Sequence, residues 1–228
     1  MPVVIYLHGN SSSRLEGMKV APQLLIRGIN IFVLDFAGCG LSEGDYISLG
    51  WNERDDVDII VDFLNKIPGV GKIGLWGRSM GASTILMYGG LNKKISSICL
   101  DSPFCEFRKL AKELCNKQIS LPDFILDTAL SIINSTIKSK NGVDINKLNP
   151  ISYSPKIKIP GFFIHAKEDE LIPVDHSIAI FEVYEGEKSL VICEGTHNSG
   201  RQKHILEKIG KFFSKYLLNI DEDEHLKI

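Results

Sequence analysis

The chain has 228 residues, a formal net charge of −2 at pH 7 and 24% charged residues, which suits one soluble α/β domain with a substantial core. So small a charge gives no electrostatic reason to expect a nucleic-acid partner. No apolar run reaches the roughly 18 residues of a membrane span, and no signal peptide opens the chain. The five cysteines have no paired spacing and are expected to be reduced thiols. We therefore expect a single cytoplasmic domain over residues 1–228.

Short β-rich runs alternate with helical patterns along the whole chain. Continuous apolar runs are expected to form strands buried on both faces, and they cover residues 3–7, 29–35, 72–76, 96–101, 161–165 and 189–193. Helical periodicity appears between them, for example in residues 56–66 and 204–217. Strands joined by helices require crossover connections, so the pattern predicts a doubly wound, mostly parallel α/β sheet flanked by helices. Such a sheet forms its functional site at the carboxyl ends of the strands.

One segment, at about residues 104–158, interrupts this alternation. It contains two helical patterns and no strand pattern, and it predicts a helical cap inserted into the domain. The second helix, starting at Pro122, carries more apolar residues than one stripe of about 100° accommodates. Leu126, Leu130 and Ile133 are therefore expected to line a pocket for an acyl chain. Packing of these residues on the sheet without substrate contact remains the alternative.

A serine follows the third expected strand in the sequence Gly77-Arg78-Ser79-Met80-Gly81. A G-x-S-x-G pattern between a strand and a helix rich in small residues is typical of a nucleophile elbow. There a sharp turn exposes the serine hydroxyl at the helix N-terminus, where the helix dipole favours developing negative charge. The alternative is an ordinary turn capped by serine.

Two further residues are placed to activate that serine. Asp169 follows the fifth expected strand in HAKEDELIP, and His197 follows the sixth in EGTHNSG. A serine nucleophile needs a base and an acid that orients the base, and the order serine, aspartate, histidine is that of α/β hydrolases. Taken singly, Asp169 and His197 could each be an ordinary loop residue. Glu168 or Glu170 could also be the acid instead of Asp169.

Acyl-bond hydrolysis also needs hydrogen-bond donors for the oxyanion. Gly9, in the segment YLHGNSSS after the first strand, lets the backbone approach a ligand closely. The backbone amides of Asn10 and Met80 are the expected donors, with His8 structural beneath them. The glycines of DFAGCGLSEG are not followed by the helix that a dinucleotide site requires. No metal or organic cofactor is needed for this chemistry.

The segments YLHGN, DFAGCGLSEG, GRSMG, DSPF, HAKEDELIP and EGTHN resemble the α/β-hydrolase superfamily over nearly the whole chain. Within it, they are most similar to the depalmitoylase-like hydrolases, and prolyl-aminopeptidase-like serine hydrolases share the outline. The resemblance implies that Ser79 is the nucleophile, Asp169 the acid and His197 the base, with Asn10 and Met80 as oxyanion donors. Members usually carry an antiparallel strand pair before the His-Gly strand. That pair is missing here, so we expect an exposed sheet edge that could pair with a second copy into a homo-oligomer.

The expected function is hydrolysis of an ester or thioester through an acyl-enzyme. The expected substrate is a small or acylated molecule of hydrophobic character, and membrane contact through the cap is compatible with this function without being required. Two alternatives stay open: an aminopeptidase-like serine peptidase, and a non-catalytic interaction protein on the same fold.

Overall fold

The computed structural model describes residues 1–89, 94–119 and 121–222. Its centre is a six-stranded sheet with the strand order β2-β1-β3-β4-β5-β6. Every described pairing is parallel. The strands are β1 (Val3–Leu7), β2 (Asn30–Val33), β3 (Ile73–Arg78), β4 (Ile95–Asp101), β5 (Gly161–Ala166) and β6 (Lys188–Cys193). The expected doubly wound α/β class is confirmed.

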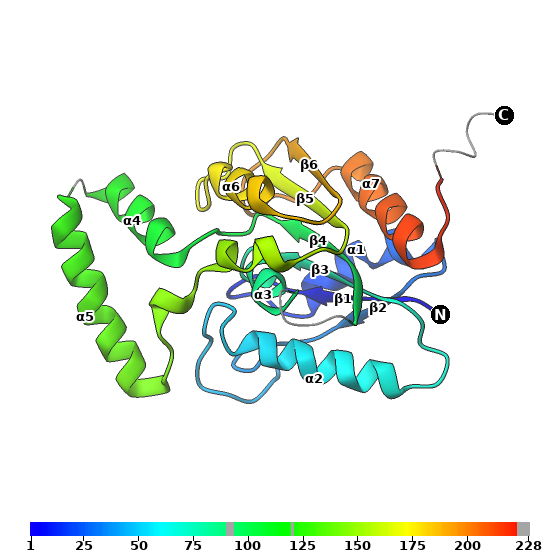
Figure 1. Cartoon of the computed structure of the whole chain (residues 1–228), viewed down its shortest axis with the longest axis horizontal. Coiled ribbons are helices and arrows are strands. Elements are labelled where there is room, and N and C mark those ends of the chain that lie inside the picture. The colour runs from blue at the N-terminus through cyan, green and yellow to red at the C-terminus, as the bar shows by residue number, and fades with distance from the viewer. Residues whose placement is uncertain (90–93, 120, 223–228) are drawn as a thin grey trace.

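Helices cover both faces of this sheet (Figure 1). α1 (Leu15–Leu25) and α7 (Lys203–Phe213) pack on one face, and α2 (Glu53–Lys66), α3 (Met80–Gly89) and α6 (Asp175–Val183) pack on the other. Successive side chains of a strand point to opposite faces. In β1, Val4 therefore joins the core under α1 and α7, whereas Ile5 joins the core under α2 and α3. Two cores explain why the strands are continuous apolar runs.

Between β4 and β5 the chain leaves the sheet and forms a helical insertion. It contains α4 (Phe107–Gln118), α5 (Asp123–Asn141) and three short 3-10 helices, the last of which is Ser154–Lys156. In Figure 1, α5 is the element farthest from the sheet, and α4 lies between it and the body of the protein. The described part of the chain contains no helix that is both long enough and apolar enough to cross a membrane.

A buried histidine of α6 holds the start of this insertion. The backbone N–H of Cys105 donates to Nδ1 of His176 at 3.0 Å, so the ring proton is on Nε2, which donates to Oε2 of Glu113 at 2.7 Å. Burial lowers the pKa of His176 below its ordinary value of 6.5, and the neighbouring Glu113 only partly opposes this effect. Protonation of His176 would remove the acceptor of the Cys105 N–H.

We expect the free energy of unfolding to fall as the pH drops from about 7.5 through the ordinary histidine pKa of 6.5. In this window the unfolded chain binds a proton at His176 that the folded chain excludes, so stability rises with pH by up to about 1.4 kcal/mol for each unit of the pKa difference. Urea unfolding across this range should show a smaller pH dependence for His176→Gln than for the wild type and for the control His204→Gln, which replaces an exposed histidine. An unchanged pH dependence in His176→Gln would assign the effect elsewhere.

Candidate active site

β3 ends in a sharp turn at Ser79, whose φ of 52° lies in the left-handed region that is costly for a residue with a side chain. α3 begins at the next residue, Met80, so Ser79 sits at a helix N-terminus. A Cβ on Gly77 would lie 2.5 Å from the backbone of Gly81, and a Cβ on Gly81 would lie 2.0 Å from the carbonyl oxygen of Leu7. Both glycines are needed because α3, β3 and β1 meet here with no room for a methyl group.

The Gly81→Ala variant is expected to lose about 3 kcal/mol of stability, because the added methyl group forces α3 away from β1. Thermal and urea unfolding should be compared with Gly71→Ala, where the nearest atoms to the new Cβ are at an ordinary 3.5 Å. Equal stability of the two variants would contradict the packing at the turn.

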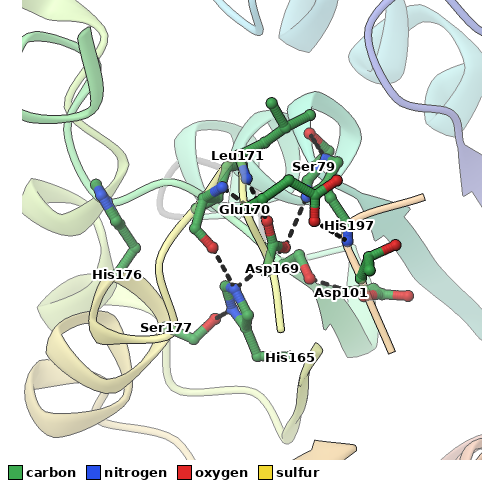
Figure 2. A network of polar contacts seen from close by, with 12 residues as sticks. Ser79, Asp101, His165, Asp169, Glu170, Leu171, His176, Ser177 and His197 are labelled. Atoms are coloured by element: carbon green, nitrogen blue, oxygen red, sulfur yellow. Dashed lines mark hydrogen bonds and ion pairs between the residues drawn. The ribbon is translucent and has the colours of Figure 1, made fainter. Parts of the chain in front are cut away.

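Ser79, His197 and Asp169 form one hydrogen-bonded line (Figure 2). Ser79 Oγ lies 3.1 Å from His197 Nε2, and His197 Nδ1 lies 2.7 Å from Asp169 Oδ2. Both Asp169 and His197 are buried, with 8% and 6% of their surface exposed. The structure therefore brings together three residues that stand far apart in the sequence, each just after the carboxyl end of a strand.

Asp169 is held from several sides. Its Oδ1 accepts the backbone N–H groups of Leu171 at 3.0 Å and Ile172 at 2.7 Å, and its Oδ2 lies 3.4 Å from Nε2 of His165, on the side away from His197. Burial raises the pKa of Asp169, but the hydrogen bonds from His165, His197 and Ile172 outweigh it and hold the pKa well below its ordinary range. The carboxylate is therefore ionised at neutral pH.

His165 is a residue of this site that sequence reasoning missed. It is fully buried, its Nε2–H donates to the carbonyl oxygen of Ile172 at 2.8 Å, and its Nδ1 accepts the hydroxyl of Ser177 at 2.6 Å. Figure 2 shows it on the opposite side of Asp169 from His197. A histidine inside an apolar strand carries no local signal of this role, because Ser177 comes from the following helix.

The two glutamates next to Asp169 contact backbone atoms of the loop between β6 and α7 (residues 194–202, the histidine loop). Glu168 Oε2 accepts the N–H of Gly195 at 2.7 Å, and Glu170 Oε2 accepts the N–H of His197 at 3.4 Å. Of the three acids, Asp169 is the one whose carboxylate reaches the His197 ring.

The loop between β1 and α1 (residues 8–14, the β1–α1 loop) runs beside Ser79. Phe36 N–H donates to His8 Nε2 at 3.1 Å, so His8 Nδ1 carries the proton and donates to the carbonyl oxygen of Gly9 at 2.8 Å. A trans peptide points its N–H opposite to its C=O, so this bond turns the Asn10 N–H away from His8. Within the described residues, neither Asn10 nor Met80 donates its backbone N–H to a protein acceptor.

Ser79 and His197 open onto a cavity of about 1270 Å³ that Asn10 and Met80 also line. Its apolar wall contains Leu49, Phe104, Phe107, Leu110, Leu114 and Ile172. The expected lining by Leu126, Leu130 and Ile133 is wrong: none of the three reaches the cavity. Leu126 and Leu130 are buried and Ile133 is 48% exposed. The reason is that α4 supplies the wall, and α5 lies farther from the sheet (Figure 1).

A parallel α/β sheet with a serine elbow after β3 and these acid and histidine positions after β5 and β6 defines an α/β hydrolase. A family model described as alpha/beta hydrolase fold matches residues 2–135, more than half of the chain, and the chain belongs to this family. A second model, described as PhoPQ-activated pathogenicity-related protein, matches residues 116–224, which is under half of the chain.

Curated relatives and solved structures agree with this family. The chain is 32% identical over 198 residues to the uncharacterized protein YqkD of Bacillus subtilis, covering 85% of this chain and 64% of YqkD. It is 24% identical over 203 residues to the lysophosphatidylserine lipase ABHD12 of Danio rerio, covering 83% of this chain and 49% of that protein. The Pyrococcus furiosus esterase Pf2001 superposes with a TM-score of 0.74 at 26% identity, over 95% of this chain and 83% of the esterase. The chain thus spans less than two thirds of these curated relatives.

Proposed function

We propose that the protein is a serine hydrolase that cleaves an ester or thioester through an acyl-enzyme. The observation that carries this proposal is the hydrogen-bonded line from Ser79 through His197 to Asp169 at the cavity. Neutral His197 takes the hydroxyl proton as Ser79 Oγ attacks the carbonyl carbon, and the Asp169 carboxylate stabilises the imidazolium. His197 then gives this proton to the leaving alcohol or thiol, and a water molecule repeats the steps to release the acid.

The negative charge that develops on the substrate oxygen needs donors that are already in place. The backbone amides of Asn10 and Met80 fit this role because both residues line the cavity with Ser79 and neither amide has a protein acceptor among the described residues. Removal of one such donor costs on the order of 10²–10³-fold in kcat in other serine hydrolases. The hydrogen bond from His8 to Gly9 supports this role by orienting the Asn10 amide.

The cavity favours an acyl group over a peptide amine. The part of its wall that α4 contributes is apolar, which suits a hydrocarbon chain. The two carboxylates among its described lining residues are already engaged: Glu16 accepts hydrogen bonds from Gly9 and Tyr6, and Asp101 pairs with the buried Arg201 at 2.6 Å. A free carboxylate is the strongest partner for the ammonium group of an aminopeptidase substrate, and neither of these two is free. The esterase and lipase names of Pf2001 and ABHD12 also support an ester substrate.

Leu114→Ala is expected to weaken the preference for long over short p-nitrophenyl acyl esters. Leu114 lines the cavity, and each substrate methylene that no longer packs against this side chain reduces the discrimination by about 0.8 kcal/mol. Leu126→Ala is the matched control, because Leu126 is buried but outside the cavity: it should lower the melting temperature and leave the chain-length profile unchanged. If the two variants show the same profile, α4 does not contact the acyl chain.

The proposed function is tested by labelling the purified protein with a fluorophosphonate and locating the modified residue by mass spectrometry. Labelling at Ser79, with turnover of acyl esters, is the expected result. Turnover of aminoacyl amides in preference to esters would instead favour a peptidase. A protein that is neither labelled nor active would be a non-catalytic binding protein on this fold.

A further inference from the structure

The cavity wall near Ser79 contains an ion pair that the reaction steps above do not use. Arg78 is the last residue of β3 and directly precedes Ser79, and Glu16 lies in the first turn of α1. Arg78 Nη1 lies 3.7 Å from Glu16 Oε1, and the two side chains are only 16% and 15% exposed. Both residues line the cavity. A half-buried pair is screened less by solvent than a surface pair, so its geometry is more strongly fixed.

Glu16 holds the β1–α1 loop. Its Oε2 accepts the backbone N–H of Gly9 at 3.1 Å, and its Oε1 accepts the hydroxyl of Tyr6 at 3.1 Å. His8 binds the carbonyl oxygen of the same glycine. Both polar groups of Gly9 are therefore occupied, and the Asn10 amide that follows is fixed in direction.

Arg78 holds the histidine loop. Its Nη2 donates to the backbone carbonyl oxygens of His197 and of Ser199, the latter at 3.0 Å. The guanidinium group thus binds the backbone of the residue whose ring contacts Ser79. A planar group with several fixed donors is suited to bridging two carbonyl oxygens and a carboxylate at once.

We propose that Glu16 and Arg78 are positioning residues that couple the β1–α1 loop to the histidine loop across Ser79. This proposal rests on the proposed function. The ion pair fixes the distance between the Asn10 amide on one side of the nucleophile and the His197 ring on the other. Because a displacement of about 1 Å in such a site can cost about 10²-fold in rate, loss of either partner should slow the chemical step more than it weakens substrate binding.

Steady-state kinetics with an acyl ester test this role. Arg78→Met and Glu16→Gln should each lower kcat by roughly 10–100-fold and change KM by less than about two-fold. The double variant should be no slower than Arg78→Met alone, because the residues act through one pair. Arg78→Lys, which keeps the charge but not the fork of donors, should recover part of kcat.

Arg27→Met is the matched control for the loss of a half-buried arginine. Arg27 also pairs with a carboxylate, Glu222 at 2.9 Å, and donates to a backbone carbonyl oxygen, that of Gln23, at 2.9 Å. It lies outside the active-site cavity. Arg27→Met should therefore leave kcat unchanged. If Arg78→Met has the same kcat as Arg27→Met, the proposal is overturned.

Amide hydrogen exchange gives a second readout that does not depend on activity. Glu16→Gln should speed exchange in the histidine loop as well as in its own β1–α1 loop, and Arg78→Met should do the same. Changes confined to the loop that each variant touches would refute the coupling. The two proposals can fail separately. If the wild type is labelled at Ser79 but each variant changes exchange only in its own loop, the proposed function stands and the coupling is rejected. If exchange changes in both loops but the wild type is never labelled, the coupling stands and the proposed function is rejected.

Discussion

Replacement of Ser79 by alanine is expected to abolish fluorophosphonate labelling and to lower ester turnover by at least ~10³-fold. Alanine removes the attacking oxygen and adds no atom to the crowded turn, so the fold should persist. Ester kinetics and circular dichroism on the same preparation measure the two effects. Ser12→Ala is the matched control, because Ser12 is a half-buried serine of the same cavity, and it should retain labelling and turnover. Labelling that persists on another serine of Ser79→Ala would reject Ser79 as the nucleophile.

Asp169→Asn is expected to lower kcat by about 10⁴-fold, although the substitution is nearly isosteric. The backbone N–H groups of Leu171 and Ile172 will keep the amide oxygen in the place of Oδ1, so the amide NH₂ group faces His197 Nδ1. That nitrogen must then accept a hydrogen bond, which moves the ring proton to Nε2. His197 can no longer accept the proton of Ser79. Single-turnover kinetics with an activated ester would measure the loss.

Glu168→Gln and Glu170→Gln are the controls for this substitution, and both should be mild. Each glutamate accepts a backbone N–H of the histidine loop, and the oxygen of a glutamine side chain can accept the same bond. If Glu170→Gln were the most damaging of the three variants, the acid would be misassigned.

The strands and the hydrogen-bonded line of Ser79, His197 and Asp169 could be predicted because their signals are local. A strand buried on both faces is a continuous apolar run. Ser79, Asp169 and His197 each follow a strand end, and a parallel sheet gathers these ends at one edge. Even so, the strand bounds differ: β3 extends to Arg78, beyond the apolar run, because its pairing with β4 continues to Asp101.

α1 is not predicted by the sequence pattern, because the helix contains both Gly17 and Pro22. Each residue disfavours a helix interior. The structure gives the reason for the glycine: an added Cβ would lie 2.6 Å from Val33 and 3.0 Å from Tyr6. A glycine is needed at position 17 because the helix contacts the sheet so closely, and such contact cannot be inferred from local propensity.

The polar contacts around the site are equally hidden in the sequence. Glu16 and Arg78, or His165 and Ser177, meet only once the chain has folded, and neither pair has a characteristic spacing. The prediction that α5 lines the pocket failed for a similar reason. The apolar content of α5 correctly indicates two nonpolar sides, but periodicity does not show which of the two helices of the insertion lies nearer the sheet. Ile132, which is 64% exposed, and Ile133 show that one of those sides faces outward.

The placement of the helical insertion has a consequence for how such a protein can change over time. The residues with proposed chemical roles lie just after the ends of β1, β3, β5 and β6, whereas Phe107, Leu110 and Leu114 belong to one uninterrupted segment after β4. Recombination that exchanges this single segment would replace much of the nonpolar wall and leave every proton-transfer group in place. Selection can therefore act on substrate choice and on bond cleavage as separate traits.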